Sequence, residues 1–264
     1  MGMVIVFFAV SILSSIAGSI CGIGGGVIIK PVLDATGIMS VSAISFLSGC
    51  TVLAMSVVSV YKNVRSKAAK LDLRIATGLA VGAAAGGVIG KTMFQSLKEA
   101  VGNEAVVGMT QAIVLIAVTL GTLIYTVFKH RIRTKTYTQI WLCVVIGILL
   151  GVMSSFLGIG GGPINLVVLA YFFSMSTKEA ALSSLYIIMF SQITSLIQTC
   201  ATGSVPKVSA AYLAAMVVGG ILGGTLGSKV NKKISEEGVN KLFIALMAVI
   251  IGINIYNAVK FGMA

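Results

Sequence analysis

FLGIGGGPINLVVL, residues 156–169, is the stretch that decides how we expect this chain to fold. A near-copy, ICGIGGGVIIKPVL, occupies residues 20–33, which lie 136 positions earlier. Each copy sets a Gly-x-Gly-Gly-Gly run between two apolar segments, and glycine inside a helix costs about 1 kcal/mol relative to alanine. Three consecutive glycines in such surroundings therefore predict a helix that is broken at this point, with backbone groups left free to bind a ligand.

The composition predicts a membrane protein. Of the 264 residues, 57% are hydrophobic and 10% are charged, and the mean hydropathy is +1.06. Apolar runs of roughly 17–25 residues recur, and a helix of that length spans the ~30 Å hydrocarbon core of a bilayer. The runs are continuously apolar and do not alternate with a period of two, as membrane strands do. We therefore expect an all-α polytopic membrane protein.

The second half of the chain repeats the pattern of the first. Three glycines of one predicted segment, Gly82, Gly86 and Gly90, align with Gly219, Gly223 and Gly227 of another. A Gly-Tyr-Lys set recurs in the same way, since Gly121, Tyr125 and Lys129 align with Gly252, Tyr256 and Lys260. We therefore predict repeat 1 at 1–128, a basic cytoplasmic connecting loop at 129–139 and repeat 2 at 140–264. Each repeat is expected to hold five helical segments: 3–20, 27–38, 41–61, 75–94 and 105–128, then 140–157, 163–175, 180–200, 208–228 and 239–258.

Each half is expected to cross the membrane an odd number of times. Its first two segments are joined by the glycine run without a polar loop. They either both cross the membrane or form a re-entrant hairpin, and both options return the chain to the side on which it started. Three further segments then cross singly, so the two repeats are predicted to have inverted topology.

The basic residues of the loops support this inversion. Loop 62–74 carries five basic residues, whereas its counterpart 201–207 carries only Lys207. A parallel duplication would put these two loops on one side, where their basic content should be similar. The net charge of +12 is thus interpreted as the positive-inside bias of cytoplasmic loops and not as a nucleic-acid-binding surface. Both termini are then expected to be extracytoplasmic.

Inverted repeats with helix breaks at matching positions are typical of secondary transporters, whose substrate site lies near the midplane. Two related breaks would meet there, and helix N-termini offer free N–H groups and a positive dipole end, which suits an anion. The alternative is that the glycines only permit close helix packing. The candidate substrate contacts in the two runs are Gly24, Gly25, Gly26, Gly160, Gly161 and Gly162.

Polar side chains near the runs add further candidates. They are Ser45, Ser48, Asn165, Ser183, Ser184 and Gln192. Hydroxyls in membrane helices often bond only the carbonyl four residues earlier, which is the alternative for each serine. Lys30 is the only basic residue well inside an apolar segment, and a charge there is costly and therefore a functional candidate. It could instead snorkel or pair with Asp34.

The sequence argues against an enzyme. Its only histidine, His130, lies in the connecting loop, and all seven acids lie at or near segment ends, so that no buried carboxylate pair is expected. The four cysteines show no paired spacing, which predicts small buried side chains and no metal ligands. We expect no cofactor. The scarcity of buried acids also predicts either uniport or coupling through the protonation of the substrate itself.

The two GIGGG runs, each followed by an Ala-x-Ser segment at Ala43–Ser45 and Ala181–Ser183, resemble the TauE/SafE sulfite exporter family over nearly the whole chain. The resemblance implies a transporter that carries sulfite, sulfoacetate or a related organosulfonate across a prokaryotic inner membrane. It does not fix the substrate. Proline follows the glycines only in the second half, at Pro163, whereas the first half has Val27, so the two half-sites are expected to bind unequally.

From these features we expect a secondary transporter that moves a small sulfur-containing anion by alternating access of the two repeats. The alternatives are an anion channel or facilitator without coupling, and a carrier of another small anion or organic acid. The expected partners are the anionic substrate and membrane lipid, and no nucleic acid. Assembly into a homo-oligomer is compatible with the sequence, which does not indicate it.

Overall fold

The computed structural model describes residues 2–66, 69 and 71–263, and these form ten α-helices, one short 3-10 helix and no strand. Lys67 and Lys70 of the basic loop, together with the side chain of His130, lie outside the described residues. The elements are α1 (Gly2–Cys21), α2 (Gly26–Thr36), α3 (Val41–Arg65), α4 (Leu73–Val101), α5 (Glu104–Phe128), η1 (Lys129–Arg131), α6 (Ile140–Phe156), α7 (Pro163–Phe173), α8 (Thr177–Ala201), α9 (Ala210–Lys233) and α10 (Glu236–Gly262).

Helix length and hydropathy confirm the prediction of an all-α polytopic membrane protein. Seven helices, α1, α3, α4, α5, α8, α9 and α10, are long and apolar enough to cross a membrane. The helices α2 and α7, which follow the glycine runs, have only 11 residues each. At 1.5 Å per residue such a helix is about 16 Å long, which is roughly half of the hydrocarbon core. A helix of that length ends inside the thickness of a membrane.

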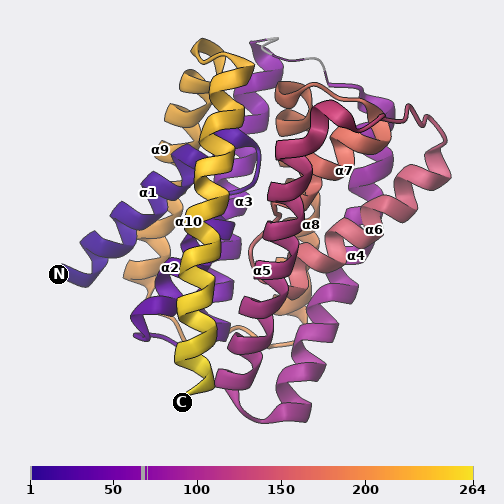
Figure 1. Cartoon of the computed structure of the whole chain (residues 1–264). Helices are drawn as coiled ribbons and strands as arrows, with labels where there is room; N and C mark the ends of the chain where they lie inside the picture. Colours follow the sequence, from indigo (N-terminus) through magenta and orange to yellow (C-terminus); the bar gives the residue numbers. More distant parts are fainter. Residues whose placement is uncertain (1, 67–68, 70, 264) are drawn as a thin grey trace.

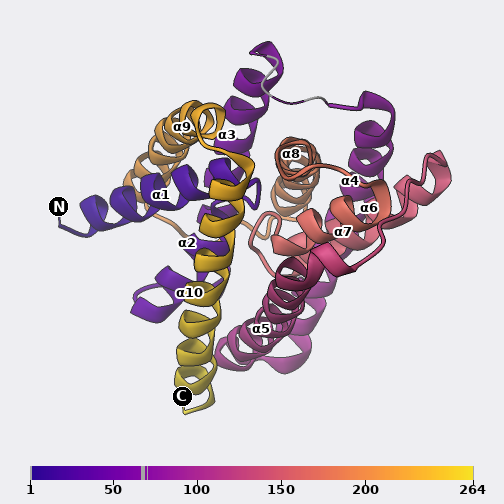
Figure 2. The same cartoon turned by 45° about the horizontal axis from the view of Figure 1, so that its top comes forward.

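The helices α3, α4, α5, α8, α9 and α10 stand roughly side by side and run between the two ends of the molecule, whereas α1 is strongly tilted (Figure 1). The C-terminal end of α3, the start of α4 and the connecting loop 129–139 lie at the end drawn at the top, which we call the basic side. The turn between α4 and α5 and the C-terminus lie at the other end, which we call the opposite side. The neighbours α5 and α10 run in opposite directions. The pairs α1–α2 and α6–α7 each turn back at a glycine loop in the interior (Figure 2).

Small residues let two helix pairs approach very closely. Along α4, a methyl group added at Gly82, Gly86 or Gly90 would overlap a backbone carbonyl oxygen of α6. Along α9, the aligned Gly223 and Gly227 lie against carbonyl oxygens of α1 in the same manner, and a methyl group at Gly219 would overlap the hydroxyl of Ser11. Backbones that touch in this way gain van der Waals contact that bulkier side chains would prevent. The short helix α6 and the tilted helix α1 are thereby held against long partners.

The helix breaks form where the glycine runs predict them. Gly22 and Gly24 have φ values of +76° and +75°, and their counterparts Gly158 and Gly160 have +65° and +70°. This left-handed region is unfavourable for residues with a Cβ atom, so only glycine adopts it at little cost. Pro163 occupies the first turn of α7, where its missing N–H is not needed.

Candidate functional site

The two glycine loops contact each other in the middle of the helix bundle. A Cβ atom built on Gly24 would lie 3.4 Å from the carbonyl oxygen of Gly160. A Cβ atom on Gly26 would overlap the carbonyl oxygen of Ile159 and would lie 2.8 Å from Ser48 Oγ. The start of α2 therefore packs directly on the backbone of the second loop.

The loops differ at their third and fourth glycines. Gly161 has a φ of +129°, and a Cβ atom there would overlap the end of the Ile188 side chain. Gly25, its counterpart, has helical angles. Gly162 is extended because the residue before a proline is pushed out of the helical region, whereas its counterpart Gly26 is already the first residue of α2. Pro163 thus delays the start of α7 by one residue.

Of the predicted serines, Ser45 and Ser48 of α3 lie against these loops, whereas Ser183 and Ser184 lie on α8, whose Ala181 contacts the first loop. Ser45, Ser48 and Ser183 are buried, and none of their hydroxyl oxygens has a hydrogen-bond partner among the residues that the structure describes. Ser45 lies beside Gly158, since a Cβ atom there would be 2.6 Å from its Oγ. A buried polar group without a partner costs about 1–3 kcal/mol, so these hydroxyls are available to a ligand.

Asn165 and Gln192 make contacts of different kinds. The amide nitrogen of Asn165 donates to Ser184 Oγ at 3.3 Å, and its amide oxygen lacks a partner. Gln192 is buried in the middle of α8, with Oε1 2.9 Å from a Cβ atom built on Gly49 of α3. Gln192 therefore lies at the α3–α8 contact, apart from the group formed by the loops and the serines.

The side chain of Lys30 does not extend to the membrane surface, and its charge is paired. Its side chain is 4% exposed, and Nζ donates to Asp34 Oδ2 at 2.6 Å. Asp34 is equally buried, and its second carboxylate oxygen has no hydrogen-bond partner within the described part of the chain. Of the alternatives that the sequence left open for Lys30, pairing with Asp34 is the one observed. The C-terminal part of α10 covers the last turn of α2, which buries the pair. Asn257 donates to the carbonyl oxygen of Pro31 at 2.8 Å, and Lys260 donates to that of Ala35 at 2.9 Å.

A cavity of about 320 Å³ opens at the basic side between α5, α7, α8 and α10. Its rim carries hydrogen-bonding side chains, which are Tyr125, Thr126, Lys129, Thr134, Ser174, Ser176, Thr177, Glu236 and Asn240. Lys129 Nζ donates to Asn240 Oδ1 at 3.1 Å. Burial lowers the pKa of the Lys129 ammonium, and the carboxylate of Glu236 opposes that shift. The rim is thus polar and carries a cation.

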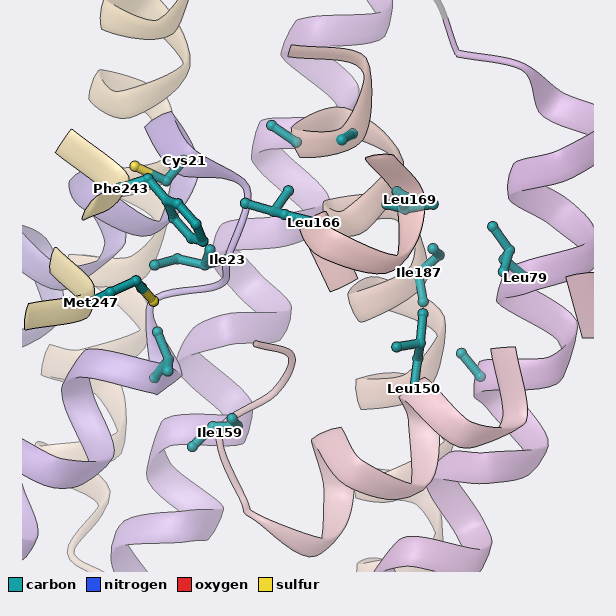
Figure 3. Close-up of a cluster of buried hydrophobic side chains, with 14 of the residues drawn as sticks. Cys21, Ile23, Leu79, Leu150, Ile159, Leu166, Leu169, Ile187, Phe243 and Met247 are labelled. Atoms are coloured by element: carbon teal, nitrogen blue, oxygen red, sulfur yellow. The ribbon is translucent and has the colours of Figure 1, made fainter. Parts of the chain in front are cut away.

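The floor of this cavity is apolar and reaches the first glycine loop. It includes Cys21, the last residue of α1, together with Leu166 and Phe243. Figure 3 shows Phe243 beside Cys21 and Ile23, with Leu166 pointing toward them from α7. Since Ile23 lies between Gly22 and Gly24, the cavity ends against the loop that meets Ile159 and Gly160.

A much smaller space of about 10 Å³ lies between the aligned helices. It is lined by Lys30, Pro31, Asp34, Gln111, Ala112, Leu115, Leu157 and Asn254. Five residues that line this small space align with residues that line the open cavity. The aligned pairs are Lys30 and Leu166, Pro31 and Val167, Asp34 and Ala170, Leu157 and Cys21, and Ala112 and Phe243. Equivalent helices of the two halves therefore each enclose a space. The space lined by Leu166 is open at the basic side, and the space lined by Lys30 is closed.

The sequence did not point to the open cavity. Tyr125 and Lys129 were noticed only because they align with Tyr256 and Lys260. The sequence does show a group of polar residues at the ends of otherwise apolar helices. Residues in such positions are usually interpreted as contacts with the membrane–water interface. Only the packing of α5, α7 and α10 shows that these residues face one another across a cavity.

The geometry agrees with the comparison with known families. The family model described as "Sulfite exporter TauE/SafE" matches residues 7–255, which include both glycine loops and all the lining residues named above. Neither a search of curated proteins nor a search of solved structures found a match. The family consists of membrane transporters, in keeping with the seven apolar helices and the paired helix breaks. The chain belongs to the TauE/SafE sulfite exporter family.

Proposed function

We propose that the chain is a secondary transporter that moves a small sulfur-containing anion by alternating access of two inverted repeats, 1–128 and 140–264, joined by the basic loop 129–139. The observation that carries this proposal is the pair of aligned spaces, one of about 320 Å³ and one of about 10 Å³. If the two halves exchange conformations, the open space closes and the closed one opens. A substrate between them then meets one side of the membrane at a time.

The packing of the helices supports inverted repeats. The aligned pairs α4–α6 and α9–α1 make the same glycine-lined contact, each joining the fourth helix of one half to the first helix of the other. The last helices of the two halves, α5 and α10, pack together and run in opposite directions (Figure 1). An in-plane pseudo-two-fold axis relates parts in this manner.

The positive-inside bias assigns the basic side to the cytoplasm. Both termini are then extracytoplasmic, in a prokaryotic inner membrane, and the open cavity faces the cytoplasm. The family description supplies the chemical class of the substrate, a sulfite-like anion. The ammonium of Lys129 at the rim favours an anion, and the carboxylate of Glu236 at the same rim partly offsets it.

The proposed substrate contacts are those named from the sequence. The proposed set is the glycine runs Gly24–Gly26 and Gly160–Gly162 at the point where the two loops meet, together with Lys30, Ser45, Ser48, Asn165, Ser183 and Ser184. Gln192, which lies at the α3–α8 interface, is also proposed to contact the substrate. In the present conformation this point is packed, so an anion reaches it when the loops part.

Transport of labelled sulfoacetate into proteoliposomes tests the proposal. We expect uptake to saturate with concentration and to accelerate when unlabelled sulfoacetate is trapped inside, because a carrier returns faster when loaded. Unlabelled sulfite and simple organic acids added outside then rank the anions by competition. Uptake that neither saturates nor responds to trapped anion would indicate a channel, and competition by organic acids alone would indicate a different substrate.

A further inference from the structure

We propose that the Lys30–Asp34 pair couples anion transport to protons, with Lys30 binding the anion and Asp34 carrying one proton with it. The inference rests on the proposed function and adds an energy source to it. It replaces the expectation from the sequence that transport is uniport or uses only the protonation of the substrate.

The pair is built into one half only. Lys30 and Asp34 line the closed space, whereas the aligned positions in the open cavity are Leu166 and Ala170. A closed space of about 10 Å³ has room for about one water molecule. Both charges are therefore shielded from solvent in the present conformation and become accessible when their space opens as its counterpart does.

Lys30 also touches the other half of the molecule. Its Cε atom lies 3.5 Å from a Cβ atom built on Gly158, in the second glycine loop and beside Ser45. An anion held by the Lys30 ammonium is thus adjacent to the unpartnered hydroxyl of Ser45 and to the loops that separate the two spaces. This places the ammonium on the route between the two sides.

The charges of the pair explain the coupling. In the closed space Lys30 and Asp34 neutralise each other through a 2.6 Å contact. An anion that binds the ammonium takes the place of the carboxylate, and a buried carboxylate without a cation is strongly unfavourable. Such a group is neutralised by taking up a proton. The second oxygen of Asp34, which has no partner, is available to hold it.

The polar side chains that face Asp34 from the neighbouring helices hydrogen-bond to carbonyl oxygens and not to its carboxylate. From α10, Lys260 and Asn257 donate to carbonyl oxygens of α2, and Asn254 donates to the carbonyl oxygen of Ile250. From α5, Gln111 donates to the carbonyl oxygen of Phe156. Among the described residues, each of these groups makes its hydrogen bond to a carbonyl oxygen, and only Lys30 makes one to Asp34. The ammonium of Lys260 is a second positive charge near the carboxylate.

The cycle conserves charge and protons. A proton from water on the opposite side binds Asp34 while the anion binds Lys30, and both leave at the basic side before the Lys30–Asp34 contact forms again. The ammonium keeps its charge throughout. A monovalent anion then moves with one proton and no net charge, whereas a divalent anion moves one net negative charge.

The experiment uses methanesulfonate, which is monovalent and permanently ionised, so that its own protonation cannot contribute. The full chain is reconstituted in liposomes with an acidic exterior and an internal pH indicator dye. We expect accumulation of about tenfold per pH unit, since one proton moves with each anion. The dye should report one proton entering per anion, with no dependence on membrane potential.

Three variants separate coupling from transport. Asp34→Asn should lower the accumulation ratio to about one and abolish proton uptake, while exchange of labelled for unlabelled anion, which moves no net proton, persists. Lys30→Leu with Asp34→Ala copies the other half, removes both charges without leaving one unpaired, and should lose proton-driven uptake in a folded protein. Glu237→Gln removes an exposed ion pair with Lys241, of the same spacing, and should change neither measurement.

Wild-type methanesulfonate flux without proton entry would overturn the coupling and leave the proposed transport standing, and it requires no variant. Gradient-driven accumulation that survives in Asp34→Asn or in the double variant would also overturn it. If Asp34→Asn loses both exchange and accumulation, Asp34 is needed for folding or for anion binding, which would contradict the proposal. Absence of flux for sulfoacetate and methanesulfonate alike would remove the proposed function and the coupling together.

Discussion

Gly26→Ala is expected to lower the initial rate of anion uptake by about 5- to 150-fold, because overpacking a close contact costs about 1–3 kcal/mol. The added methyl group would overlap the carbonyl oxygen of Ile159 and press on Ser48 Oγ. A carbonyl oxygen belongs to the backbone and cannot rotate away like a side chain, so the two glycine loops must separate. Initial rates of labelled sulfoacetate uptake measure the effect.

Gly162→Ala is the matched control, since Gly162 is the aligned glycine of the other loop. Its backbone is extended, and an added methyl group would lie 3.3 Å from the flexible Cδ1 atom of Ile159. Uptake by this variant should stay within about twofold of the wild-type rate, because alanine keeps the backbone groups through which Gly162 would contact the anion and a small displacement of the Ile159 side chain costs little. An equal loss of uptake in both variants would mean that the effect of Gly26→Ala does not come from the contact between the loops.

Ala170→Trp is expected to reduce uptake to the background of empty liposomes. Ala170 lines the open cavity on α7, and an indole in place of its methyl group would occupy much of the roughly 320 Å³. The larger side chain would exclude the anion from this conformation and would also prevent α7 from closing onto α5 and α10. Uptake and exchange, measured in the same proteoliposomes, should both disappear.

Ala117→Trp is the control for the bulk of the new side chain. Ala117 lies on the exposed face of α5, where a tryptophan would contact lipid. Near-normal uptake by this variant, with similar yield and detergent stability for both proteins, would assign the loss in Ala170→Trp to the cavity. Substantial uptake by Ala170→Trp would show that the cavity is not on the substrate route.

The helices and their breaks could be predicted from the sequence because each depends on local chemistry. Apolar length sets which segments can cross a bilayer, and glycine with a positive φ sets where α1 and α6 lead into short helices. The ridge of Gly82, Gly86 and Gly90 likewise needs only the spacing of small residues on one helix face. The predicted inverted relation of the two halves goes further, and remains a proposal.

The candidate site was only partly accessible from sequence. The glycines, Lys30 and the serines were named, but an alignment treats the two halves as equal. It therefore cannot tell that the space around Leu166 is open while the one around Lys30 is closed. Burial of Asp34 also depends on Asn257 and Lys260, which are more than two hundred positions away in the chain. Such contacts follow from the packing of α10 on α2 and not from local pattern.

The reciprocal opening of the two aligned spaces is tested most directly by cysteine accessibility in proteoliposomes of known orientation. Single cysteines are placed at Ala170 in the open cavity and at Ala112 in the closed space, with the four native cysteines replaced. A membrane-impermeant maleimide is then applied to each side, with and without sulfoacetate. We predict that position 170 reacts only from the basic side and position 112 only from the opposite side, and that any condition raising one rate lowers the other. High reactivity of both positions under the same condition, or rates that change independently, would contradict alternating access.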